Sequence, residues 1–153
     1  MFKKKGLEFK IVDDSILSIA DYDWYIDKIN LIYIDVSCMN NNKFSIYIAT
    51  DNEIDKLYFE SKKYEEVLSE FRILCFALMD VKPNFMIHGF RCFNFDNITT
   101  IDHSKKLIVN MALGHSMKIT FNNLYTLTLD VSESELKSYL YQIDCVKNQG
   151  KTI

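Results

Sequence analysis

The chain has 153 residues, 48% hydrophobic and 25% charged, which is typical of one globular domain and excludes a disordered or fibrous chain. The net charge of −3 excludes the general basic excess that binds phosphate backbones unaided, although it permits a local basic stripe. One proline and four glycines leave no Pro/Gly-rich hinge, so we expect a single module over residues 1–153.

The first half predicts strands followed by a helix. Strands are expected over 7–12 and 16–20 around an Asp13-Asp14 turn, then over 24–37 and 43–50 across an asparagine triplet, and over 54–59. Ser61 opens a helix whose apolar positions recur at helical spacing from Tyr64 to Leu78, and the segment around Pro83 ends it.

The second half predicts the same order. Strands are expected over 85–88, 90–95, 98–102 and 107–112, then a tight turn at Gly114-His115, and strands over 117–121 and 124–131. Ser132 or Ser134 then caps a helix with one apolar face. This face consists of Leu136, Tyr139, Leu140 and Ile143.

An internal match supports a duplication. Residues 24–32 align without a gap with residues 93–101, an offset of 69, and the aspartates Asp27 and Asp96 are identical, as are two isoleucine pairs, Ile29/Ile98 and Ile32/Ile101. Downstream, residues 44–49 are matched with 107–112, and Phe59 with Phe121 before each helix. We therefore predict an α+β fold of two degenerate β-meander-plus-helix copies, 7–80 and 85–146, with a tail 147–153. The copies are expected to form antiparallel sheets with two main helices, packed as one pseudo-twofold module.

Targeting and cysteine signals indicate a cytoplasmic protein. Lys3, Lys4 and Lys5 are followed by charged residues that interrupt any apolar signal region, and the longest apolar run, Ile73–Met79, is seven residues where a membrane span needs roughly twenty. The four cysteines are widely spaced without a C-x-x-C pair, so we expect free thiols, no metal site and no cofactor. The apolar helix end at Ile73–Met79 is expected to be buried within the chain, with a homodimer seam as the alternative.

No catalytic motif is found, so we expect a protein that is not an enzyme. Asp102-His103-Ser104 contains the residue types of a hydrolase triad, but adjacent residues of an extended chain point to opposite sides, and we interpret them as a polar turn. His88 and His115 are interpreted as structural or surface histidines. Asp51–Asp55 resembles the start of a calcium loop, yet Lys56 stands where the loop requires glycine.

Single-stranded nucleic acid is the alternative partner. Residues 88–95 partly resemble the aromatic strand of RNA-recognition motifs through Gly89, Phe90 and Phe95, but Cys92 departs from that pattern and the element order differs. Meanders ending in a helix also look like the Whirly-like fold of single-stranded-DNA-binding proteins, which implies an aromatic and basic sheet face. The residues that would supply it are Trp24, Tyr25, Lys28, Phe90, Arg91, Phe93, Lys105 and Lys106.

A protein partner is the first expectation. Acidic patches at Asp13-Asp14, Asp21 and Asp23, Asp51–Asp55, and Glu65, Glu66 and Glu70 would repel a polyanion, whereas aromatic residues among acidic ones suit a protein surface. We therefore predict a non-enzymatic binding or adaptor module of the inhibitor or immunity type.

Overall fold

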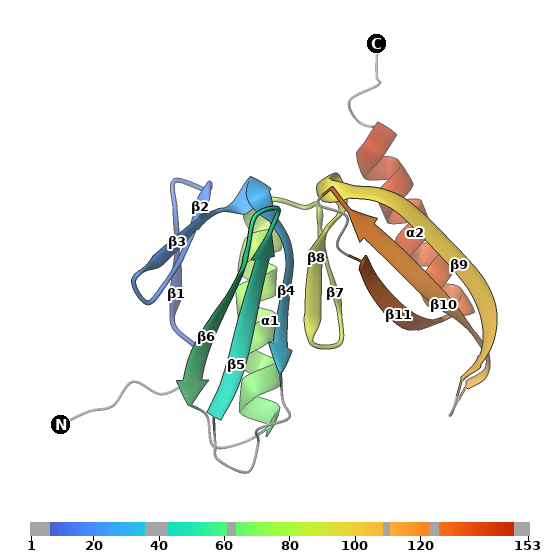
Figure 1. Ribbon diagram of the computed structural model, residues 1–153, viewed down its shortest axis with the longest axis horizontal. Coiled ribbons are helices and arrows are strands. Elements are labelled where there is room, and N and C mark those ends of the chain that lie inside the picture. Colours follow the sequence, from blue (N-terminus) through green and yellow to red (C-terminus); the bar gives the residue numbers. More distant parts are fainter. Residues whose placement is uncertain (1–6, 36–42, 61–63, 109–110, 123–125, 149–153) are drawn as a thin grey trace. The chain divides into compact units, whose positions relative to one another are not determined.

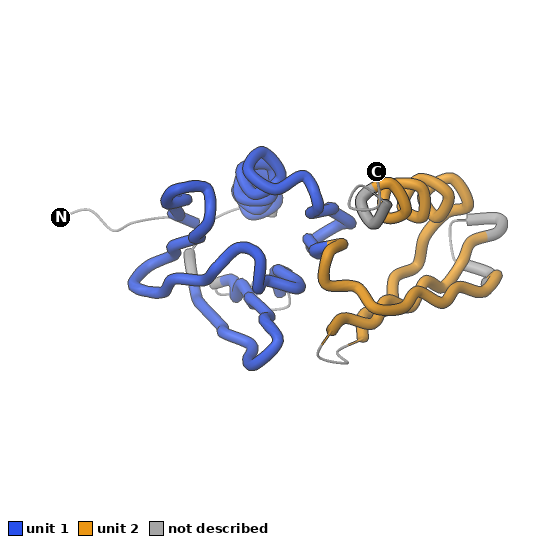
Figure 2. The backbone as a smooth tube through the Cα atoms, turned by 90° about the horizontal axis from the view of Figure 1, so that it is seen from above, with its two compact units in different colours: residues 1–94 blue, residues 95–153 orange. Residues whose placement is uncertain are grey.

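The computed structural model describes residues 7–35, 43–60, 64–108, 111–122 and 126–148 (Figure 1). Its described part is α+β, with two helices and eleven strands in antiparallel sheets. By its internal contacts the chain divides into two compact units, residues 1–94 and 95–153, which are described separately below (Figure 2). The hairpin at the start of the second predicted copy belongs to the first unit.

Unit 1 begins with a small antiparallel sheet of three strands in the order β1-β2-β3. These are β1 (Phe9–Val12), β2 (Ile16–Ile19) and β3 (Tyr22–Tyr25). The first turn places Asp13 and Asp14 at φ values of 52° and 56°, and the second places Ala20 at 54°. Aspartate tolerates this left-handed region better than most residues, which explains why the Asp-Asp pair marks the turn.

A second sheet in unit 1 has the strand order β6-β5-β4-β8-β7, with α1 (Tyr64–Val81) behind it (Figure 1). Its strands are β4 (Ile29–Asp35), β5 (Lys43–Thr50), β6 (Ile54–Glu60), β7 (Phe85–His88) and β8 (Arg91–Asn94). The β7–β8 hairpin joins the sheet at β4, where Ile32 pairs with Cys92 and Tyr33 with Arg91. The predicted single strand over 24–37 is in fact β3, a short 3₁₀ helix η1 (Ile26–Lys28) and β4.

The core of unit 1 lies between α1 and the inner face of the five-stranded sheet. The helix contributes Val67, Phe71, Leu74, Cys75 and Leu78, each 0% exposed. Buried residues of the three-stranded sheet, including Leu17 and Trp24, join the same cluster. The expected burial of the whole Ile73–Met79 run is wrong, because Ile73 and Phe76 are each 57% exposed. An α-helix packed on one layer turns only one side to the core.

Unit 2 is a three-stranded antiparallel sheet, in the order β11-β10-β9, with one helix. Its elements are a 3₁₀ helix η3 (Phe95–Asn97), β9 (Ile98–Ile108), β10 (Met111–Phe121), β11 (Thr126–Ser132) and α2 (Glu133–Asn148). The helix packs on β10 and β11 over a core that includes Met117, Ile119 and Leu129. Ser132 caps α2: its hydroxyl accepts a hydrogen bond from the Glu135 amide, and the Glu135 carboxylate accepts one from the Ser132 amide.

Two predicted turns of unit 2 are wrong. Gly114 and His115 lie inside β10, where they pair with Lys106 and Lys105 of β9. Asp102, His103 and Ser104 lie inside β9 and are all exposed. Asp102 and Ser104 lie on one face of β9 and His103 on the other, so this edge strand is polar on both faces here, and its composition resembles that of a turn.

The offset of 69 residues recurs in the backbone as well as in the sequence. It relates β3 to β8, η1 to η3, and the start of β4 to the start of β9. It also relates the left-handed residue of each hairpin, Ala20 and Gly89 (φ 61°). Asn30 and Thr99, again 69 apart, each lie at a register shift of the meander. The two stretches thus share local geometry; their common origin and a pseudo-twofold packing stay predictions.

The predicted downstream matches join different strands and are wrong. Residues 44–49 lie in β5, whereas 107–112 run from the end of β9 into β10, and Phe59 lies in β6 whereas Phe121 ends β10. The two helices begin 69 residues apart, at Tyr64 and Glu133, whereas a four-residue match within them, Ser69-Glu-Phe-Arg72 with Ser134-Glu-Leu-Lys137, has an offset of 65.

Candidate functional site

The aromatic residues of the predicted nucleic-acid platform are mostly buried. Trp24 is 6% exposed and donates a hydrogen bond of 2.7 Å from Nε1 to Asp55, and Phe93 is 0% exposed. Phe90 is half-buried and lies 6.4 Å from Phe71, centroid to centroid. Tyr25 is the exposed aromatic of the set, at 67%. Three of the four rings therefore have little free surface on which a base could stack.

The cations of this set are divided between the two units. Lys28 follows β3 and Arg91 begins β8, and both are exposed. Lys105 is exposed on β9 in the other unit, and the side chain of Lys106 lies outside the described residues. Neither unit by itself collects the predicted aromatic and basic residues on one face.

A different aromatic and basic set crosses the outer face of the five-stranded sheet. Register pairs His88 with Arg91, Arg91 with Tyr33, Tyr33 with Tyr47, and Tyr47 with Lys56, so one residue of each strand contributes. Directly paired residues lie on the same face of a sheet. We call these five residues the tyrosine row.

Three side chains of the tyrosine row, those of Tyr33, Tyr47 and Lys56, contact one another. The Tyr33 and Tyr47 rings are nearly parallel, 6° apart, with centroids 4.6 Å apart. The Lys56 ammonium lies 5.4 Å from the Tyr47 centroid and 5.0 Å from that of Tyr58, which is 67% exposed. Hydrogen bonds to Tyr58 and then to Tyr47 raise the pKa of Lys56 above its usual range, so it remains a cation.

This stacking decides which atoms the row can offer to a ligand. Tyr47 stands between Tyr33 and Lys56 in the register, so Tyr33 stacks on one face of its ring and Lys56 bonds to its hydroxyl. Arg91 and Lys56, both exposed, add a cation toward each end. In the sequence, residues at alternate positions in 33–35, 45–47 and 56–58 are the ones that share this face of the sheet. Only the strand register shows that they lie beside one another.

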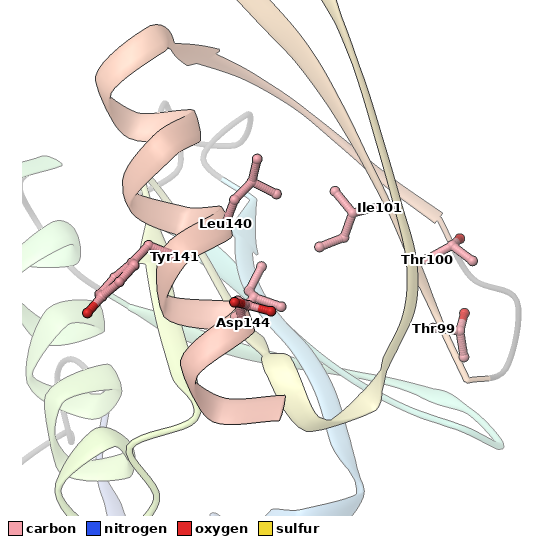
Figure 3. A pocket seen from close by; sticks show the side chains of 7 residues that line it. Thr99, Thr100, Ile101, Leu140, Tyr141 and Asp144 are labelled. Carbon is pink, nitrogen blue, oxygen red and sulfur yellow. The ribbon is translucent and has the colours of Figure 1, made fainter. Parts of the chain in front are cut away.

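Unit 2 has a groove between α2 and the edge strand β9, with a volume of about 510 Å³ (Figure 3). Leu140 of α2 and Ile101 of β9 point toward one another across it, whereas Tyr141 points away. Thr99, Thr100, Ile143 and Asp144 complete its lining. The groove is therefore apolar in the middle and polar at its ends. Tyr139 precedes Leu140 on α2, and burial and then the Glu135 charge raise its pKa to about 12.

Groups typical of catalysis or metal binding are sparse in the described part of the chain. His115 is 6% exposed, and neither of its ring nitrogens has a hydrogen-bond partner among the described residues. The His103 ring lies edge-on to it, with centroids 6.2 Å apart. Within the described ranges, no three His, Cys, Asp or Glu side chains gather as a metal site, and no helix is long and apolar enough to cross a membrane.

No protein-family model matches the chain, and no curated protein matches its sequence. The function must therefore be argued from the two surfaces themselves.

Proposed function

We propose that this protein is a binding module that engages a protein partner through the tyrosine row of unit 1. The observation that carries the proposal is the stacked Tyr33–Tyr47 pair, flanked in register by the exposed cations Lys56 and Arg91. Tyrosine and arginine are enriched among the residues that dominate protein interfaces. Prior stacking also reduces the entropy lost when these side chains are held in a complex.

The same geometry disfavours nucleic acid as the partner of this face. Base stacking requires an open ring face, and Tyr33 already stacks on one face of Tyr47 while Lys56 lies 5.4 Å from its centroid. The aspartate Asp35 lies on the same face, one row from Tyr33, and would repel a phosphate backbone. Single-stranded nucleic acid remains the second candidate because Lys56 and Arg91 are cations beside aromatic rings.

A photo-crosslinking experiment tests the proposal. A benzophenone amino acid is placed at Tyr58, beside the row, and in a matched variant at Thr128, an exposed residue on β11 of unit 2. Irradiation in a lysate of the source cells should give a protein adduct at position 58 that is absent at 128. The purified adduct protein should bind the wild-type chain, and Arg91→Ala or Tyr33→Ala should weaken binding about tenfold or more.

Two results would contradict the proposal. Adducts that are the same at both positions would show that the row selects no partner. Saturable binding of a single-stranded oligonucleotide that weakens with salt and is lost in Arg91→Ala would assign the row to nucleic acid instead.

A further inference from the structure

The groove in unit 2 has a counterpart in unit 1 that is filled. In unit 1, the β7–β8 hairpin pairs with β4 and packs on α1, and it contributes Phe85 and Cys92 to the core. The offset of 69 relates β4 to β9, so the edge of β9 corresponds to the edge of β4 that receives the hairpin. Among the described strands, none pairs with that edge of β9.

Residues of unit 2 are more exposed than their equivalents in unit 1, as expected if unit 2 lacks the covering hairpin. Ile32 of β4 is 0% exposed and pairs with Cys92, whereas Ile101 of β9 is only half-buried and lines the groove. On the helices, the offset of 65 relates Leu74 and Cys75 to Tyr139 and Leu140. The first pair is 0% exposed, and the second pair is half-buried. The groove is therefore the position that a hairpin occupies in unit 1.

The contact between Cys75 and Cys92 shows how closely the hairpin fits in unit 1. A hydrogen bond from Cys75, together with burial, raises the pKa of the Cys92 thiol, so the two side chains touch inside the core. Leu140 lines the groove of unit 2, and among the described strands none covers it, so apolar surface remains open to a strand that brings its own apolar side chains.

A second copy of this chain fits the groove poorly. The hairpin of this chain that corresponds to β7–β8 at the offset of 69 is β2–β3, and the same offset places Asp23 of β3 at the position of Cys92. Asp23 would then face Ile101 and Leu140, near the carboxylate of Asp144. Burying a carboxylate among apolar residues beside a second one is costly.

We propose that the α2–β9 groove accepts an antiparallel β-hairpin of a partner protein, which extends the sheet at β9 as β8 extends it at β4. In unit 1 the Ile34 amide donates to the Phe90 carbonyl at 3.1 Å, so the equivalent amide of His103 donates to the incoming strand. The partner strand places an apolar side chain opposite Ile101 and a basic one near Asp144. This is strand addition, in which main-chain hydrogen bonds supply affinity and side-chain pockets supply specificity.

The test uses a cyclic peptide with the sequence of residues 84–95 of this chain, with alanine in place of Cys92 to prevent oxidation. Calorimetry should show one-to-one binding to the full chain with a dissociation constant below about 100 μM. Hydrogen exchange of amides within Thr99–His103 should slow at least tenfold when the peptide is bound, because strand pairing protects them.

A matched pair of variants separates strand addition from other binding. His103→Pro removes the amide equivalent to that of Ile34, which bonds to the hairpin in unit 1, so proline should leave the pairing of β9 with β10 intact. His103→Ala keeps the amide and removes the same imidazole. We expect His103→Pro to weaken peptide binding at least tenfold and His103→Ala to leave it within twofold. Circular dichroism verifies that both variants fold, and Leu140→Gln, which leaves the backbone intact, should weaken binding as well.

Several outcomes would overturn the inference. These are no binding by the wild-type chain, protection elsewhere than on β9, and equal binding by the two His103 variants. A concentration-dependent dimer that His103→Pro dissociates would assign the groove to a second copy. The substituted residues His103 and Leu140 do not belong to the tyrosine row, so this site and the proposed function can fail independently.

Discussion

The two meander-and-helix assemblies of this chain differ in what covers them. In unit 1 the β7–β8 hairpin completes the sheet at β4 and closes the core beneath α1, and α1 buries five side chains completely. In unit 2 the corresponding edge and helix border an open groove, and Tyr139 and Leu140 are only half-buried. The two stretches have related sequences but differ in burial. The reason is that a hairpin pairs with β4 in unit 1, whereas no described strand pairs with the free edge of β9 in unit 2.

The largest expected effect compares the helix anchors Phe71 and Leu136, which correspond at the offset of 65. Phe71 is 0% exposed within a closed core, so Phe71→Ala should cost about 4 kcal/mol of unfolding free energy. Leu136, 5% exposed, loses fewer atoms, and Leu136→Ala should cost about 2 kcal/mol. Urea unfolding followed by Trp24 emission and by helical circular dichroism measures both. Equal costs would show that the two cores are closed to the same extent.

The next effect compares the identical pair Ile32 and Ile101. Ile32→Ala should cost about 3 kcal/mol because the residue is fully buried under the hairpin. Ile101→Ala should cost about 1 kcal/mol because the groove already exposes part of the side chain to solvent. If peptide binding fills the groove, the cost of Ile101→Ala measured with saturating peptide should rise. A cost for Ile101→Ala as large as that for Ile32→Ala, without peptide, would contradict an open groove.

A smaller effect concerns the bond that connects β3 to β6 in unit 1. Asp55 accepts the hydrogen bond of the Trp24 indole, which is buried. Asp55→Ala leaves the indole N–H without this acceptor and should cost about 1–2 kcal/mol. Trp24 is the only tryptophan, so its emission maximum should shift to longer wavelength as water reaches the ring. An unchanged spectrum and stability would show that the bond contributes nothing.

The smallest effect is a pH dependence at Glu70. Burial raises the pKa of this carboxyl despite the opposing hydrogen bond from the Leu7 amide, and the nearby Glu66 raises it further. A raised folded pKa means stability that is fully present below the unfolded value of about 4.3 and is lost as pH rises through the folded pKa. Glu70→Gln should reduce this loss of stability as pH rises above the unfolded pKa, seen in urea midpoints. Parallel pH profiles for the two proteins would contradict the assignment to Glu70.

Sequence patterns predicted the elements more closely than they predicted the site. Helical spacing indicated α1 and α2, and Asp13-Asp14 marked a real turn, because these signals depend on residues near one another in the chain. The turn predicted at Gly114-His115 is wrong because a glycine beside a polar residue is typical of turns, yet here both residues lie inside a long strand, β10. The tyrosine row was missed because its five residues come from five strands, and composition carries no information on register.

By itself the sequence determined the α+β class, the places of the two helices, and the offset that relates Ile29 to Ile98 and Ile32 to Ile101. All of these follow from short-range periodicity, turn chemistry and self-similarity. Only the tertiary structure decided which aromatics are buried, so that Trp24 and Phe93 entered cores while Tyr33 and Tyr47 stacked on an outer face. It also decided that the edge of β4 is paired with β8, whereas the equivalent edge of β9 is open. The paired segments β4 and β8 lie about sixty residues apart in the chain, so no local sequence pattern predicts that they pair.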